Sequence, residues 1–375
     1  MNYLSIIKIS VVTFPFIAFL TTLPYILREY HKYGSVYWYR ALIIYSFILY
    51  LLTAYFLVIL PLPTREEVMA LTTPTTQLIP FNFVTEFITK SGFVISDFST
   101  YFKALTSSYV FVPLFNIVLT IPFGAYLHYY FKFSFKKTCL FTFLLSLFFE
   151  LTQLSGLYFI YPRGYRLFDV DDLILNTLGG IIGYFVGTLL LKFLPNREEI
   201  DDTALELGMK VSGFRRTLAY GIDLFIFLVF YMIIRFTFNI TFAYNFFGFA
   251  FIYFIIIPWI FKGQTLAYKF LKIKIISTKH DKVTLLEMIL RNLLFYTFYL
   301  VLPILIIILC SSIVNYFNNT IYVYTILLLI LFIFLYYVIS FFTLAIKKTL
   351  FYERWSKTKI VSTIKTDKKN DDDTN

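Results

Sequence analysis

Charged side chains are scarce in this sequence: Asp, Glu, Lys and Arg together make up 15% of its 375 residues. A soluble protein carries about a quarter charged residues. Hydrophobic residues account for 59% of the chain, and they occur in repeated blocks of roughly 20 residues, the length that spans a bilayer core. This pattern excludes a soluble globular protein and predicts a polytopic integral membrane protein.

Cysteine is also rare. The two cysteines, Cys139 and Cys310, both lie inside apolar blocks, and we interpret them as small buried hydrophobic residues rather than as a disulfide or a metal site. A cleavable signal peptide is lacking, because the first apolar block, from about Ile9 to Leu27, has no basic leader and no small-residue cleavage site. We expect this block to be retained as a membrane span. No internal repeat is visible, which argues against an inverted-repeat transporter.

The apolar blocks predict an all-α bundle of about nine transmembrane helices. They lie near residues 9–27, 41–60, 112–131, 138–160, 173–194, 217–235, 244–261, 292–314 and 321–346. A polar segment separates the first five from the last four. We therefore expect a five-helix domain at 1–194, a cytoplasmic linker at 195–216, a four-helix domain at 217–346 and a basic, then acidic, disordered tail at 347–375.

Lysine and arginine are distributed unevenly between the two sets of loops. With the N-terminus outside, 26 of these residues fall on the cytoplasmic side and 7 on the outer side. Cytoplasmic loops of membrane proteins are enriched in positive charge, so the split predicts an outer N-terminus and a cytoplasmic C-terminus. It also accounts for the net charge of +11 without nucleic acid as a partner. The abundance of Ile, Phe, Tyr, Lys and Asn is typical of a low-GC bacterium, so we expect a bacterial cell membrane.

Polar side chains cluster around the outer loop between the fourth and fifth predicted spans. Such groups are costly inside a membrane, so each needs a partner or a function. In the predicted orientation they converge at the outer membrane surface, where they form a candidate ligand-binding site. Its members are Asn116, Glu150, Gln153, Arg166, Asp169, Asp171, Asp172 and Asn176.

Two interpretations of this polar cluster remain open. Neighbouring carboxylates repel one another, and Arg166 or a bound divalent ion would offset that repulsion in a functional site. In a purely structural role, Asp172 would cap the fifth span while Arg166 paired with Asp169. The number of polar residues in the cluster favours a functional site. Their spacing does not identify the ligand, and whether the site binds a metal ion is left open.

The fifth predicted span carries a seam of small residues, Gly179, Gly183 and Gly187, at four-residue spacing. Such seams let two membrane helices approach closely. We expect this one to pack against the fourth span and to hold Glu150 near Asn176.

The polar cluster lies in a stretch that resembles the VanZ-like family. The resemblance rests on residues 150–153 and 166–180, with 78–82 and 116–124 upstream, and it covers about residues 40 to 194. The chain departs from the family pattern in a long insertion between Gln153 and Arg166. The resemblance implies a role in resistance to glycopeptide antibiotics of the teicoplanin type.

The second half resembles the RDD family, named for one arginine and two aspartates. Arg216 and Asp223, seven residues apart, match its first pair, and Asp281 is a candidate for the second aspartate. A lysine-rich stretch at 262–276 follows the family pattern, with Ala267 in place of a glycine. Its lysines would reach the anionic head groups of the inner leaflet. The resemblance implies a role in transport or in binding membrane partners.

Three functions follow from these observations. The leading hypothesis is a protein that is non-enzymatic or of unproven chemistry and that has no cofactor. Its outer site would bind a lipid head group, a cell-wall precursor or another lipid-linked envelope component and reduce glycopeptide action, with the RDD part as an anchor or partner surface. The second is a Mg²⁺-dependent enzyme acting on a lipid-linked phosphate, although no histidine base or nucleophile is visible near the aspartates. The third is a cation-coupled transporter that uses Asp223 and Glu150.

Overall fold

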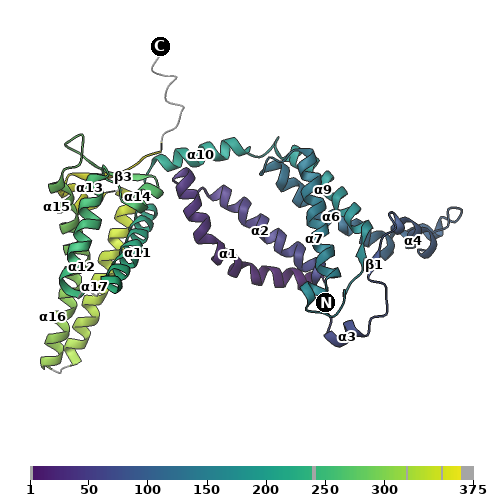
Figure 1. Ribbon diagram of the computed structural model, residues 1–375, viewed down its shortest axis with the longest axis horizontal. Helices are drawn as coiled ribbons and strands as arrows, with labels where there is room; N and C mark the ends of the chain where they lie inside the picture. Colours follow the sequence, from purple (N-terminus) through teal and green to yellow (C-terminus); the bar gives the residue numbers. More distant parts are fainter. Residues whose placement is uncertain (1–2, 239–241, 318–319, 348, 365–375) are drawn as a thin grey trace, which may run out of the picture. The chain divides into compact units, whose positions relative to one another are not determined.

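The computed structural model describes residues 3–238, 242–317, 320–347 and 349–364. The chain divides into two compact units, which are described separately (Figure 1). The N-terminal unit consists of Met1–Leu23 and Trp38–Asp201, and the C-terminal unit consists of Pro24–Tyr37 and Asp202–Asn375. The end of the first helix therefore belongs with the second half of the chain, which no local sequence pattern indicates.

All five spans predicted for the first half are helices long and apolar enough to cross a membrane. Between them lie the short helices α3 (Arg65–Met69), α4 (Asn82–Lys90), α5 (Ser99–Leu105) and α8 (Gly156–Phe159), and a small parallel pair of strands, β1 (Thr76–Gln77) and β2 (Phe168–Asp169). The spans are α1 (Tyr3–Tyr33), α2 (Trp38–Ile59), α6 (Ser108–Tyr129), α7 (Phe135–Leu154) and α9 (Val170–Leu190).

The four spans predicted for the second half are helical as well. The first is α11 (Gly213–Phe238). The second and third each contain a π-helical turn: α12 (Phe242–Phe251) continues through η1 (Ile252–Ile256) into α13 (Ile257–Ile260), and α15 (Leu285–Tyr296) continues through η2 (Thr297–Val301) into α16 (Leu302–Phe317). The fourth is α17 (Thr320–Lys347). The described residues thus hold seven helices long enough to span a membrane and two shorter apolar ones, which confirms the prediction of an all-α polytopic membrane protein.

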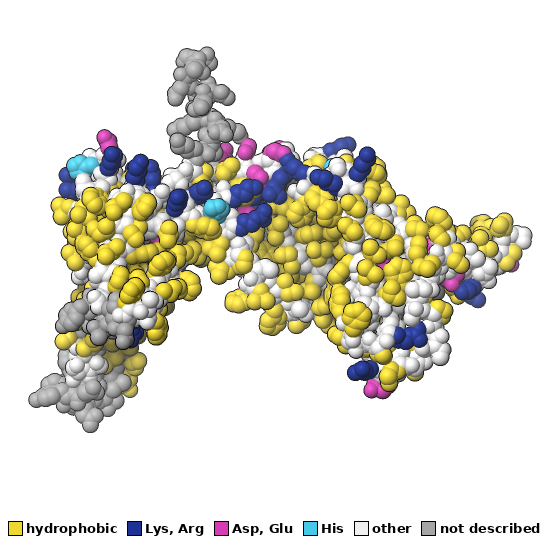
Figure 2. Space-filling view, viewed as in Figure 1, with side chains coloured by type: hydrophobic (Ala, Val, Ile, Leu, Met, Phe, Trp, Pro, Cys, Tyr) yellow, Lys and Arg dark blue, Asp and Glu magenta, His cyan; other side chains and the backbone are white. Residues whose placement is uncertain are grey.

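Large hydrophobic side chains cover the sides of these helices (Figure 2). Phe185 of α9 is 61% exposed, and Phe225 and Phe236 of α11 are 68% and 79% exposed. Aromatic rings exposed in this number along long helices would make a soluble protein aggregate. Lipid is the solvent that such surfaces require.

The prediction of a disordered tail from residue 347 was wrong for its first part. Helix α18 (Phe351–Trp355) and strand β4 (Thr358–Ser362) follow α17, and β4 pairs antiparallel with β3 (Ile273–Ser277). Ile360 lies opposite Ile275, and both side chains are buried in the core of the C-terminal unit. The lysines in and around β4 made this segment resemble a charged tail, so the alternation of buried and exposed residues that is typical of a strand was not recognised. Residues 365–375 of the predicted tail lie outside the described residues.

The segment predicted as a linker, 195–216, contains a helix, α10 (Arg197–Met209). Ile200 and Ala204 on this helix are fully buried despite its many charges. The division between the two units falls inside it, after Asp201. In the C-terminal unit, the hydroxyl group of Ser35 donates a 2.6 Å hydrogen bond to the carbonyl oxygen of Ala204, which ties the residues after α1 to α10. Two additional short helices in the C-terminal unit, α14 (Leu266–Phe270) and α18, flank the small sheet.

The glycine seam of α9 packs against α6 and not, as expected, against α7. A Cβ atom placed on Gly179 would collide with the carbonyl group of Ile117 in α6, and Gly183 lies against the next turn of that helix. Gly180, one residue further along α9, meets Thr142 of α7 instead. Successive helical residues point in directions about 100° apart, so adjacent glycines face different neighbours. Helix α9 therefore contacts α6 and α7 at once.

Candidate functional site

A cavity of about 280 Å³ lies in the N-terminal unit, where the ends of α2, α6, α7 and α9 meet. Its apolar wall includes Phe115, Leu119 and Phe149. Two of the eight predicted site residues, Asp169 and Asp171, do not line it. The six that do are Asn116, Glu150, Gln153, Arg166, Asp172 and Asn176.

Two carboxylates face this cavity, and each has a neutral partner. Glu150, only 2% exposed, accepts a 2.9 Å hydrogen bond at Oε2 from the backbone N–H of Asp169. Asp172 accepts a hydrogen bond from the side-chain amide of Asn116. Neither carboxylate belongs to an ion pair among the described residues. Arg166 lines the same cavity but makes no ion pair with either carboxylate among the described residues.

Asn176 lines the same cavity and is 4% exposed. Its Nδ2 atom donates a 2.9 Å hydrogen bond to Ser146 Oγ, whereas its Oδ1 atom has no partner among the described residues. A buried acceptor left without a donor costs about 1–3 kcal/mol. Sequence reasoning missed Ser146, although it stands one turn before Glu150 on the same face of α7. The unpaired Oδ1 atom is an acceptor that a ligand can satisfy.

Arg166 and Gln153 meet at the carboxyl end of α2. Arg166 donates two hydrogen bonds, from Nη1 to the carbonyl oxygen of Val58 at 2.6 Å and from Nη2 to that of Leu60 at 2.8 Å. Gln153 Nε2 donates to the same Val58 oxygen at 3.0 Å. The carbonyl groups at the end of a helix lack hydrogen-bond partners within that helix. The side chains of Arg166 and Gln153 act as the missing donors for α2. The long insertion between Gln153 and Arg166 therefore does not separate them.

The cap of α9 is Asp169 rather than Asp172. Asp169 Oδ1 accepts hydrogen bonds from the backbone N–H of Asp171 at 2.8 Å and from Gln77 Nε2 at 3.2 Å. The expected pair between Asp169 and Arg166 is not formed, because the guanidinium group is engaged with α2. Burial raises the pKa of Asp169 above its ordinary value. The structural alternative for Asp172 was therefore wrong, and its carboxylate is left to the cavity.

Asp171 anchors the loop between α2 and α6 to the bundle. Its two carboxylate oxygens accept hydrogen bonds from the backbone N–H groups of Phe81 at 2.5 Å and Phe83 at 2.8 Å, at the start of α4. The side chain is 3% exposed. A carboxylate at the amino end of a helix satisfies N–H groups that have no partner within it. The role of Asp171 is thus to hold the loop beside the cavity.

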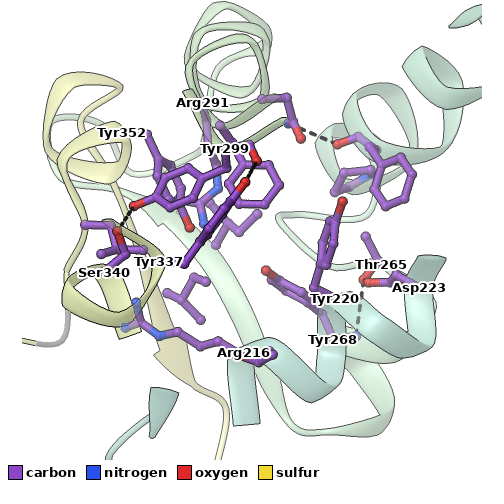
Figure 3. A pocket seen from close by; sticks show the side chains of 18 residues that line it. Arg216, Tyr220, Asp223, Thr265, Tyr268, Arg291, Tyr299, Tyr337, Ser340 and Tyr352 are labelled. Atoms are coloured by element: carbon purple, nitrogen blue, oxygen red, sulfur yellow. Dashed lines mark hydrogen bonds between the residues drawn. The ribbon is translucent and has the colours of Figure 1, made fainter. Parts of the chain in front are cut away.

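A second cavity, of about 310 Å³, lies in the C-terminal unit and is lined by both Arg216 and Asp223 (Figure 3). The two do not pair. Asp223 accepts hydrogen bonds from Tyr253 Oη at 2.9 Å, Thr265 Oγ1 at 2.5 Å and the backbone N–H of Ala267 at 3.2 Å. Both of its oxygens are therefore already occupied by donors.

Arg216 pairs instead with Glu353, through a 2.9 Å contact between Nη1 and Oε2. Glu353 was missed because it lies in the predicted disordered tail. Asp281, the candidate second aspartate, is exposed in the loop after β3 and does not line the cavity. Among the described residues, no group of three or more His, Cys, Asp or Glu is placed to hold a metal ion.

Comparisons with known proteins agree with this division of the chain. A family model described as VanZ/LLP1 matches residues 47–191, which contain all eight residues of the polar cluster. A model described as RDD family matches residues 210–349, which contain Arg216 and Asp223. Neither the curated proteins nor the solved structures include a match to the chain. The chain is therefore a multi-pass membrane protein in which a VanZ-like domain is fused to an RDD domain.

Proposed function

We propose that the cavity of the VanZ-like domain binds the polar head of a cell-envelope amphiphile, and that this binding lowers sensitivity to glycopeptides of the teicoplanin type. The observation that carries the proposal is the buried, unpaired Oδ1 atom of Asn176, a residue that lines one cavity together with two carboxylates, neither of which belongs to an ion pair among the described residues. Three residues with acceptor oxygens line one cavity, and such a lining calls for a ligand rich in donors. Ammonium, amide and hydroxyl groups provide such donors, and they are the groups of lipid heads and cell-wall precursors.

The wall of the cavity supports an amphiphilic ligand. Phe115, Leu119 and Phe149 contribute apolar surface to the cavity, which the carboxylates of Glu150 and Asp172 also line. Ligand sites combine a mostly apolar lining with a few placed polar groups. A head group would meet the carboxylates while the first part of its hydrocarbon chain lay against the phenyl rings.

The orientation belongs to the same proposal. The 26-to-7 distribution of Lys and Arg favours an outer N-terminus in a bacterial cell membrane. The cavity lies at the carboxyl end of α2 and the amino end of α9, which this orientation assigns to the outer surface. Glycopeptides act on that side of the membrane, so a ligand held there is one that they encounter.

The substitution Asp172→Asn tests the proposal. It removes one carboxylate charge while retaining an oxygen that can accept from Asn116, so membrane insertion and thermal stability should stay nearly unchanged. We expect glycopeptide tolerance in a susceptible bacterial host to fall to that of cells without the protein. The measurement is the minimal inhibitory concentration of a teicoplanin-type drug at expression levels matched by blot.

Asp169→Asn is the matched control. It removes the same charge from a residue that caps α9 and does not line the cavity, and asparagine caps a helix about as well as aspartate. Tolerance should therefore persist. Full tolerance in Asp172→Asn, or equal losses in both variants, would contradict the proposed role of the cavity.

A further inference from the structure

Two neighbouring arginines at the start of α11 have different surroundings. Arg215 is fully buried and its side chain donates three hydrogen bonds, to the carbonyl oxygens of Leu271 at 2.7 Å and of Gly208 and Lys272 at 2.8 Å. The side chain of Arg216 makes a single hydrogen bond among the described residues, to Glu353, although a guanidinium group has five N–H donors. Its Nε atom is buried without a partner among the described residues. Each nitrogen of the Arg215 guanidinium group therefore has a partner, whereas the Nε atom of Arg216 has none among the described residues.

The charges around Arg216 leave a local positive excess. Glu353, fully buried, is shared between Arg216 and Arg291, whose Nη2 atom lies 3.1 Å from Oε1. Arg291 is occupied further by Thr358 Oγ1 at 2.8 Å and by the ring of Tyr352. Two guanidinium groups thus share one carboxylate. Buried charge without a counter-ion is costly, so an anion bound beside Arg216 would stabilise this arrangement.

Asp223 does not supply the missing negative charge at Arg216. Its carboxylate lies beside Thr265, away from the guanidinium group of Arg216 (Figure 3). No ion pair joins Arg216 and Asp223 among the described residues. The three donors that hold Asp223 come from neutral groups. Both carboxylate oxygens of Asp223 therefore have hydrogen-bond donors, whereas the guanidinium group of Arg216, on the positive side of the cavity, still lacks acceptors among the described residues.

Tyrosines surround the positive side. Tyr220 and Tyr268 lie between Arg216 and Asp223, and Tyr352 lies near Arg291 (Figure 3). Burial raises the pKa of the Tyr352 hydroxyl group, so it stays protonated at neutral pH. Phenolic hydroxyl groups are additional donors for an anion, and their rings offer apolar surface.

We propose that the cavity beside Arg216 binds the phosphate group of an anionic ligand. Guanidinium groups bind phosphate oxygens through two parallel N–H donors. In Arg216, Nη1 donates to Glu353, and the remaining N–H groups of the guanidinium group are available for a phosphate. The cavity volume of about 310 Å³ suits a head group or a small metabolite. This site is separate from the polar cavity of the VanZ-like domain and does not depend on the function proposed there.

Two sources offer this phosphate chemistry. Membrane-spanning helices α11, α15 and α17 contribute Tyr220, Phe295 and Tyr337 to the wall, and the small sheet closes one end with Ile275 and Ile360. A phospholipid head group at the depth of the helix ends could enter between the helices, and a soluble phosphate compound could enter past the sheet. Both would place their phosphate against Arg216.

The experiment measures binding by the purified full chain in detergent, through the shift of its unfolding temperature with ligand concentration. The probes are dioctanoyl phosphatidic acid, glycerol phosphate and dioctanoylglycerol, which lacks the phosphate. Stabilisation by the phosphatidic acid alone assigns the site to lipid, and stabilisation by glycerol phosphate as well assigns it to a soluble ligand. Equal stabilisation by dioctanoylglycerol would overturn the proposal.

Variants separate anion binding from a structural role. Arg216→Gln leaves Glu353 and Arg291 as a neutral pair, and it should weaken phosphate binding by about tenfold or more, the effect of one charged hydrogen bond. Glu353→Gln frees both arginines and should tighten binding, even if it lowers the unfolding temperature of the unliganded protein. Lys274→Gln removes a positive charge from a residue outside the cavity and should leave binding unchanged. Unaltered affinity in Arg216→Gln, or weaker binding in Glu353→Gln, would refute the assignment.

Discussion

Residues of one type have different roles in this protein because their partners differ. Three aspartates occur within four positions at the start of α9. Asp169 caps the helix, Asp171 holds the backbone of the loop between α2 and α6, and Asp172 lines the cavity with Asn116 as its partner. A helix turns by about 100° per residue, so neighbours point at different surroundings. Their shared acidity is visible in the sequence, but their separate roles depend on what each one faces.

Asn176 provides a further prediction at the scale of a single residue. Replacing it with aspartate adds a third carboxylate to a buried space that already holds Glu150 and Asp172. Like charges that are close together and shielded from water repel strongly. We expect Asn176→Asp to impair glycopeptide tolerance, measured as minimal inhibitory concentration at matched expression. Tolerance equal to that of the unaltered protein would show that this position tolerates negative charge.

Arg215 gives a prediction about stability. Its three hydrogen bonds to carbonyl oxygens tie α11 to α10 and to the start of β3. Lysine has a single nitrogen and cannot reach all three, and hydrogen bonds to a charged group contribute about 1.5–3 kcal/mol each. We expect Arg215→Lys to lower the free energy of unfolding by about 2–4 kcal/mol, measured by thermal unfolding in detergent. A change no larger than that of Lys274→Gln would mean that these contacts are dispensable.

At the scale of elements, the contact between α6 and α9 organises the VanZ-like domain. Gly183 lies against the backbone of α6 at Gly124 and Ala125. Close backbone approach strengthens the attraction between membrane helices, and here it acts together with hydrogen bonds such as that from Thr120 Oγ1 of α6 to the carbonyl oxygen of Asn176 of α9. The same contact brings Asn116 of α6 to Asp172 of α9, so the packing of the glycines and the shape of the cavity are linked.

The substitution Gly183→Leu tests this link. A leucine cannot fit against backbone atoms, and overpacking of this kind costs about 3 kcal/mol or more. We expect a lower yield of folded protein, measured as the monodisperse fraction in size-exclusion chromatography, and a loss of glycopeptide tolerance. Gly221→Leu is the control, because a Cβ atom at Gly221 of α11 meets nothing within 4 Å. Normal yield and tolerance in Gly183→Leu would show that α6 can move away without consequence.

At the scale of the whole molecule, the orientation in the membrane determines whether each cavity faces the cytoplasmic or the outer side. Ser96, in the loop between α4 and α5, and Asp281, in the loop after β3, are both exposed. In a background with Cys139→Ser and Cys310→Ser, a cysteine at Ser96 should react with an impermeant thiol reagent applied to intact cells. A cysteine at Asp281 should react only after the membrane is permeabilised. Reaction in the opposite sense would move the polar cavity to the cytoplasmic side.

Local patterns in the sequence were sufficient to predict the membrane spans and to find six residues that line the polar cavity, but not Ser146. The length of an apolar block and the cost of a buried polar group are properties of a short stretch of chain. Six cluster residues line one cavity because they lie near the ends of helices on the same side of one bundle. The two family resemblances rest on the same local runs, which is why both could be recognised before the fold was known.

The tertiary structure decided the contacts between distant residues. It determined that the glycine seam meets α6, that Asp169 rather than Asp172 caps α9, and that Arg216 pairs with Glu353, 137 residues further along the chain. A helical stripe of glycines specifies a close approach but not its partner, and a charged tail does not reveal that one of its acids is buried. Partner choice follows from the packing of all the helices together, and no local pattern contains that information.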